Sequence, residues 1–310
     1  MHRQGVRLVI TILIHCLLVI FMPPLLLGVI TRTKAVFAGR KGAPVLQPYY
    51  DLIKLFRKDA VISDTTTWIF KAGPVVTLAA TFIAAMVLPL GNHRSPVSFS
   101  GDMILFAYLF GLARFFTTIA ALDTGSSFEG MGAAREVTFS CLAEPAVFFG
   151  LITLSRISQS LSLSDMLTVT SPSTWVWAGA TLILLSTALF IVVLAENCRI
   201  PFDDPNTHLE LTMVHEVMVL DHSGPAFGYI LYGAAMKLFL FGALFLNVAL
   251  PFRTGHAFAD WGLFIIGMLA LAVAIGVVES VMARLRLTQI PLLLLVATIL
   301  SAFSMLLIFR

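Results

Sequence analysis

The groups that could do chemistry gather in one polar segment of the chain. Residues 196–225 read ENCRIPFDDPNTHLELTMVHEVMVLDHSGP and contain six carboxylates, three histidines and one arginine. Such side chains exchange protons, bind cations or contact a charged partner. The flanking sequence is apolar, and lipid can satisfy neither the backbone nor the charges of so long a polar segment. We therefore expect it to lie in water or against a partner protein and to form the functional face.

The local pattern predicts a helix over residues 205–221, with Asp204 as its N-cap and a proline as its first residue. Successive histidines at intervals of seven would share a face, about 10 Å apart along the axis, which is too far for one metal ion. The HExxH motif of zinc proteases is also absent. Two interpretations stay open: one or two histidines titrate against a partner, or all are ordinary surface residues. The histidines are His208, His215 and His222.

The cysteines do not predict a redox or metal centre. Cys16, Cys141 and Cys198 form no CxxC pair, and no set of cysteines and histidines has the spacing of a zinc or iron–sulfur site. We therefore expect neither a disulfide framework nor a resident cofactor in this chain. If the protein takes part in redox chemistry, another subunit must hold the redox centres.

The composition identifies the membrane as the environment that positions these groups. Hydrophobic residues make up 58% of the 310 residues and charged residues 12%, against about 25% charged residues in soluble domains. The expected fold is an all-α integral membrane protein, with one transmembrane domain over residues 1–310 and the bilayer, not nucleic acid, around it. The first apolar run is too long for a signal peptide and is expected to be retained. The expected spans are 8–30, 72–90, 102–121, 138–157, 174–195, 228–249, 260–282 and 289–308.

The connecting loops predict an orientation. Loops on one side contain twelve Lys and Arg residues and those on the other side five, so the positive-inside rule places the first set in the cytoplasm and both termini on the outer face of the inner membrane. The cytoplasmic loops are then 31–71, 122–137 and 196–227. Within the first, residues 49–58 have the apolar spacing of an amphipathic helix on the membrane surface. The alternative is an ordinary basic loop that sets topology.

Five ionisable residues are expected at one depth in the cytoplasmic half of the membrane. Charges inside a bilayer cost roughly 2.5–3.5 kcal/mol each on insertion scales, and they usually mark ion or proton pathways. A proton or ion relay is therefore the favoured interpretation, and ion pairs that only lock helices together are the alternative. The predicted relay residues are Arg114, Glu144, Glu196, Lys237 and Glu279.

Several motifs together resemble one family. It comprises subunit 1 of respiratory complex I and the equivalent membrane subunit of formate hydrogenlyase and other energy-converting NiFe hydrogenases. The motifs are ENCRIPFD at 196–203, RKGAP at 40–44, LQP at 46–48, KL at 54–55, ARFF at 113–116, LDTGS at 122–126, GAARE at 132–136 and AEP at 143–145. The last four of these are most similar to the hydrogenlyase branch.

The resemblance implies a role between a cytoplasmic redox arm and a proton-pumping membrane arm. In complex I, this subunit's first inner loop and surface helix shape the quinone chamber, and its buried carboxylates begin the proton-transfer axis. By matching positions, that axis would include Glu144, Glu196, Asp203 and Glu210, with Glu279 as a further candidate. Iron–sulfur clusters, and a nickel–iron site where one is retained, would belong to soluble partner subunits, and antiporter-like subunits would be the membrane partners.

The chain departs from the family pattern on the face that would meet the redox arm. Asn206 and His208 replace two carboxylates of the usual acidic run, and Asp221 begins DHSG where the family has EYSG. These changes argue against quinone binding and for altered partners. The residues expected on the partner interface are Arg40, Arg135, Arg199, Asp203, Asp204, His208, Glu210, His215 and Asp221.

The sequence therefore predicts a non-catalytic membrane-anchoring and coupling subunit of a hydrogenase-type oxidoreductase, which links cytoplasmic electron transfer to proton or sodium movement. One alternative is a quinone-site subunit of a respiratory NADH dehydrogenase. An alternative of another class is a stand-alone secondary ion transporter, although no internal repeat supports it.

Overall fold

The computed structural model describes residues 2–203, 213–251 and 254–309, and this part of the chain is helical, without a strand. Eight of its helices are long and apolar enough to cross a membrane, which confirms the predicted fold class. They are α1 (His2–Phe37), α3 (Trp68–Val87), α4 (Asp102–Asp123), α5 (Ser127–Ser158), α7 (Pro172–Glu196), α8 (Gly224–Ala249), α9 (Ala257–Val281) and α10 (Ile290–Ile308). Three short helices join them: α2 (Gln47–Phe56), α6 (Leu163–Thr168) and the 3-10 helix η1 (Glu216–Val219).

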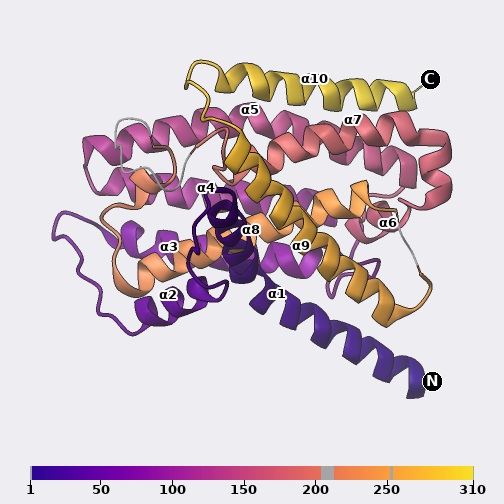
Figure 1. The fold of residues 1–310 in the computed structure, drawn as a ribbon, viewed down its shortest axis with the longest axis horizontal. Helices are drawn as coiled ribbons and strands as arrows, with labels where there is room; N and C mark the ends of the chain where they lie inside the picture. Colours follow the sequence, from indigo (N-terminus) through magenta and orange to yellow (C-terminus); the bar gives the residue numbers. More distant parts are fainter. Residues whose placement is uncertain (1, 204–212, 252–253, 310) are drawn as a thin grey trace.

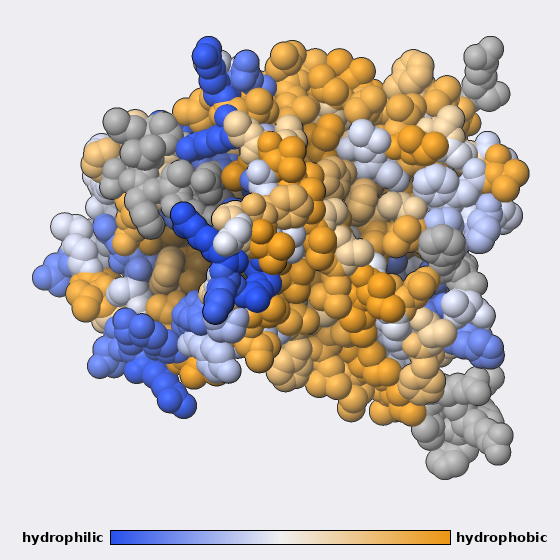
Figure 2. Space-filling model, in the orientation of Figure 1, coloured by the Kyte–Doolittle hydropathy of each residue, from blue (hydrophilic) through white to orange (hydrophobic). Residues whose placement is uncertain are grey.

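The helices α5, α7 and α10 run along the long axis of the molecule, α1 and α9 are inclined to them, and both termini lie at the same end (Figure 1). The α10 helix packs along α5 and α7, α3 packs against α4 and α8, and α1 packs against α9. The opposite end carries α2, the connection from α2 to α3 and residues 213–223 before α8. Figure 2 shows hydrophilic side chains gathered at this end around a hollow, beside a broad hydrophobic belt. A belt of this kind is what lipid-facing helices require.

The α2 helix is the amphipathic helix that the sequence predicts, two residues earlier than expected at each end. It packs against α1 and α8, with Phe56 in ring contact with Tyr229 of α8 at a centroid distance of 5.6 Å. Tyr50 and Ile53 remain exposed. These exposed apolar residues fit a helix that lies along the membrane surface.

The predicted loop 122–137 is wrong over most of its length, because α5 begins at Ser127. The glycines that favoured a turn have different roles. Gly125, with φ of +70°, makes the turn between α4 and α5. Gly132 lies inside α5, where a Cβ atom would clash with Val217 and crowd Met218, both residues of η1. Gly132 therefore serves close packing against the segment after α7 rather than chain reversal.

The predicted helix over 205–221 is also wrong where the structure describes it. Residues 204–212 lie outside the described residues, and from Met213 to Asp221 the only helical part is the 3-10 helix η1. The backbone N–H of Val214 donates to the Asp203 carboxylate at 2.8 Å, and the carbonyl of Met213 accepts from Arg135 at 3.0 Å. Because side chains occupy these backbone groups, the groups do not enter an α-helical ladder.

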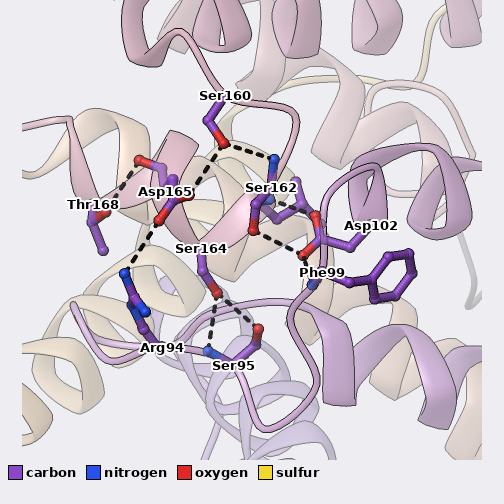
Figure 3. Close-up of polar contacts among 10 residues, drawn as sticks. Arg94, Ser95, Phe99, Asp102, Ser160, Ser162, Ser164, Asp165 and Thr168 are labelled. Carbon is purple, nitrogen blue, oxygen red and sulfur yellow. Dashed lines mark hydrogen bonds and ion pairs between the residues drawn. The ribbon is translucent and has the colours of Figure 1, made fainter.

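A polar cluster fixes the connections at the end of the molecule that holds the termini (Figure 3). The fully buried Asp102, at the start of α4, accepts from the backbone N–H of Leu163 at 2.6 Å and from the Ser162 hydroxyl at 3.1 Å. Ser95 and Ser164 are hydrogen-bonded through their hydroxyls at 2.8 Å. This cluster ties α6 to the connection before α4, and its contacts are accounted for by structure alone.

Candidate functional site

A cavity of about 1220 Å³ opens at the end opposite the termini. Its wall is formed by residues of α1, α2, α3, α4, α5, α7, α8 and α9, by η1 and by the segments that flank it. Apolar side chains such as Leu27, Phe110 and Ile230 alternate with ionisable ones. Four of the five predicted relay residues line it: Arg114, Glu196, Lys237 and Glu279.

A chain of ion pairs crosses from α5 to α8 through this wall. Arg114 of α4 pairs with Glu144 of α5 and, through Nη2, with Oε2 of Glu196 at 2.8 Å. Lys237 of α8 places its Nζ 2.8 Å from the same Glu196 oxygen. The side chain of Glu196 is 2% exposed and that of Glu144 is 43% exposed. This series of ion pairs therefore connects the outer surface of the helical bundle, at Glu144, with the buried cavity wall.

The fifth relay residue, Glu279 of α9, belongs to a second group. Its fully buried carboxylate pairs with Lys34 of α1 at 2.9 Å and with Arg199 at 3.5 Å. The structure thus gathers the predicted relay residues into two ion-paired clusters. Lys34 was missed as a site residue because it follows the predicted end of the first span, whereas α1 continues to Phe37.

Asp203 anchors the segment that follows α7. One carboxylate oxygen lies 2.9 Å from Nη2 of Arg284, and the other accepts from the backbone of Val214 at 2.8 Å. Asp203 is 3% exposed. It lines the cavity but offers little surface to a partner protein.

The other predicted interface residues have different settings. Arg40 is exposed at the cavity and Asp221 is exposed beside η1. Arg135 is half-buried and holds the Met213 carbonyl, while Arg199 is taken up by Glu279. Asp204, His208 and Glu210 lie outside the described residues.

The two described histidines of the polar segment are not simple surface residues. His215 lines the cavity close to Glu136 and Cys198, and its burial lowers its pKa, partly offset by the Glu136 charge. Burial also raises the pKa of the Cys198 thiol well above its usual range, with a further contribution from Glu136. His222 stacks on the Phe70 ring at a centroid distance of 4.0 Å.

The structure has eight apolar spans, a surface helix and ion-paired carboxylates around a cavity at one end. These features define a multi-pass membrane protein with buried ionisable groups in its interior. The family described as NADH dehydrogenase matches residues 8–309. The chain belongs to this family, in which complex I subunit 1 is a member, and the predicted resemblance is confirmed.

Individual relatives lie in two branches. The chain is 32% identical to formate hydrogenlyase subunit 4 of Escherichia coli over 90% of its own length and 92% of that protein. It is 32% identical to hydrogenase-4 component C of the same organism, covering 79% and 76% of the two chains. A subunit of the NADH-quinone oxidoreductase of Rickettsia prowazekii is 26% identical, over 67% and 61% of the two chains.

A solved structure has the same fold. A chain in the structure of the membrane-bound sulfane sulfur reductase, an archaeal respiratory membrane complex, superposes with a TM-score of 0.82. The superposition covers 96% of this chain and 98% of the other at 22% sequence identity. The two chains therefore share one fold.

Proposed function

We propose that this protein is the membrane-anchoring and coupling subunit of a hydrogenase-type oxidoreductase complex, which links cytoplasmic electron transfer to proton or sodium translocation. The observation that carries the proposal is the ion-paired chain from Glu144 to Lys237, which leads from the bundle surface to the cavity wall. The similarity to the formate hydrogenlyase and hydrogenase-4 subunits over most of the chain supports it.

In this proposal the cavity end faces the cytoplasm, in the inner membrane, and receives the redox partners. The excess of Lys and Arg in the loops at this end supports that orientation. Soluble hydrogenase-like and iron–sulfur subunits would cover Arg40, Asp221 and the neighbouring exposed residues. Antiporter-like membrane subunits would lie beside α5, where Glu144 reaches the bundle surface. The redox groups, including any NiFe site, would belong to these partners.

The coupling role follows from the chemistry of the two clusters. Carboxylates and lysine in a dry environment can exchange protons when a nearby charge changes. A charge that changes in the redox arm above the cavity would act first on Glu279 and Glu196, which line it. Arg114 would transmit the change to Glu144, because one guanidinium contacts both carboxylates.

Purification in a mild detergent, with an affinity tag on this chain, tests the proposal. We expect iron–sulfur subunits and antiporter-like subunits to copurify in fixed proportion. A chain that purifies alone and transports ions after reconstitution would instead indicate a secondary transporter. Copurified quinone, with activity lost on its extraction, would favour the NADH dehydrogenase alternative. Outer-face labelling of Lys58→Cys in intact cells should fail, and labelling of Ser100→Cys, at the other end, should succeed.

A further inference from the structure

Three potential metal ligands from different parts of the chain meet in the cavity wall. Glu136 belongs to α5, Cys198 follows the end of α7, and His215 precedes η1. One carboxylate oxygen, the thiol sulfur and one imidazole nitrogen all lie within 4.8 Å of one another. The thiol is already 3.5 Å from Oε2 of Glu136. In a tetrahedral zinc site with bonds of roughly 2.0–2.3 Å, sulfur and oxygen ligands are about 3.6 Å apart.

Glu136 differs from the other buried carboxylates around the cavity. Glu196, Glu279 and Asp203 each pair with at least one Lys or Arg. Glu136 is 7% exposed, yet no Lys or Arg of the described chain lies within ion-pair distance of it. Its hydrogen bond is to the Cys198 thiol. Arg114 interacts with the Glu136 charge only from beyond ion-pair distance. A buried carboxylate without a directly paired cation is costly, and a bound cation would stabilise it.

The His215 ring and the Cys198 backbone are both compatible with a ligand role. Among the residues that the structure describes, none hydrogen-bonds the His215 ring, so a ring nitrogen is available as a ligand. Cys198 has a φ of +48°, a conformation uncommon for a residue with a side chain, and such outliers cluster at functional sites. All three residues also line the large cavity, which gives access to solvent.

We propose that Glu136, Cys198 and His215 form a binding site for a divalent transition metal, with Zn²⁺ as the best fit. A thiolate, an imidazole and a carboxylate are the ligand types that zinc takes, and three protein ligands leave a fourth position open toward the cavity. With a thiolate and a carboxylate, the zinc site would be neutral overall, which suits its buried setting. The ion would tie α5, the end of α7 and the segment before η1 together.

The spacing of cysteines and histidines along the chain gives no sign of this site. A separation of 62 residues between Glu136 and Cys198, and the long stretch from there to His215, fit no short zinc motif. The expectation that the chain holds no metal depended on local spacing alone. The proposed site rests on tertiary contacts and is independent of the proposed coupling function.

Binding of Co²⁺ to the full-length chain in detergent tests the site. Co²⁺ takes the same ligands as Zn²⁺, and a bound thiolate gives it an intense charge-transfer absorption. We expect about one Co²⁺ per chain, with this absorption, and displacement of Co²⁺ by Zn²⁺. Cys198→Ser should remove the absorption and weaken binding beyond the roughly 10–100-fold that loss of an outer-shell partner costs. Cys141→Ser, which changes an exposed cysteine, is the matched control and should bind as the wild type does.

Two further variants keep the test decisive if Cys198→Ser does not fold. Glu136→Gln and His215→Asn should each weaken Co²⁺ binding while the thiolate absorption persists at saturating metal. Helical content of the metal-free variants, from circular dichroism, checks their folding. The proposal is overturned by any of three results: no equimolar binding to the wild type, wild-type affinity in Cys198→Ser, or loss of the absorption in Cys141→Ser.

Discussion

One carboxylate oxygen of Glu196 lies 2.8 Å from Nζ of Lys237 and also 2.8 Å from Nη2 of Arg114. With Glu144 included, the cluster has two negative and two positive side chains and is neutral overall. Neutrality is what makes four ionisable groups tolerable within the span region. Neutralising one of these four side chains therefore leaves the cluster with a net charge, whereas neutralising one acidic and one basic side chain together does not.

Glu196→Gln should destabilise the protein strongly. It leaves Lys237 without the carboxylate, and breaking a buried pair from one side costs about 3–5 kcal/mol. Thermal unfolding and the yield of folded protein in detergent measure the loss. The double variant with Lys237→Gln restores neutrality and should recover most of the yield. Equal losses in the single and double variants would show that the pair is not the cause.

Glu144→Gln should have a different outcome. Its side chain is 43% exposed, and Arg114 keeps Glu196 as a partner, so the stability cost should be at most about 1 kcal/mol. The variant should assemble and transfer electrons between soluble substrates, yet lose ion translocation. Assembled amount and ions moved per electron, measured in one preparation, separate a relay from a structural pair. A normal ratio would remove Glu144 from the pathway.

Asp203→Asn should free the segment around η1 from its contacts with Asp203. Any weakening of partner binding should follow from this loss of order, not from loss of a direct contact with the partner. From the sequence, reversing the charges of Asp203 and Asp204 together is expected to detach the redox subunits. In the structure, however, Asp203 is buried, pairs with Arg284 and accepts a hydrogen bond from the Val214 backbone. Loss of such a buried charge pair should cost about 3–5 kcal/mol. Limited proteolysis of residues 213–223 should therefore become faster.

The matched control for that experiment is Asp221→Asn. Asp221 is exposed at the other end of the same segment, and its backbone N–H, not its carboxylate, bonds Glu129 at 3.1 Å. Proteolysis should stay at the wild-type rate in this variant, while binding of the redox subunits weakens if Asp221 faces them. Faster cleavage in the control, or unchanged cleavage in Asp203→Asn, would contradict the anchoring role of Asp203.

The spans and the surface helix could be predicted from sequence because each depends on local hydrophobic pattern and length. Membership of the family could also be predicted, since its motifs are local. The start of α5 could not, because Gly132 reads as a turn residue until its contact with η1 is known. Composition does not distinguish a glycine that bends the chain from one that permits close packing.

The ion-pair partners of the charged residues could not be predicted from the sequence either. The sequence predicts that Glu144, Glu196 and Lys237 share a depth in the membrane, but depth does not determine neighbours. Glu279 pairs with Lys34 instead, because α1 packs against α9. Over Met213 to Asp221, the described part of the helix predicted at 205–221, the side chains of Asp203 and Arg135 bind the backbone, so the local pattern does not determine its conformation.

His222 should make stability depend on pH. It is 7% exposed and stacks on Phe70, and burial lowers its pKa below the ordinary value of 6.5, partly offset by Asp221. The unfolded chain therefore binds this proton more readily than the folded chain. The stability that the neutral ring contributes is complete above pH 6.5 and is lost as pH falls from there to the lowered pKa, by about 1.4 kcal/mol per unit of pKa depression.

The variant His222→Phe tests this dependence, because it keeps a stacking ring and removes the titrating group. Thermal unfolding of the purified chain, compared at pH about 7.5 and about 5.5 on either side of the ordinary histidine pKa, should show a smaller acid-induced loss in His222→Phe than in the wild type. His256→Gln, which changes an exposed histidine at the other end of the molecule, should retain the wild-type dependence. An equal loss in wild type and His222→Phe would assign the acid sensitivity to other groups, because a ring that does not titrate cannot couple folding to pH.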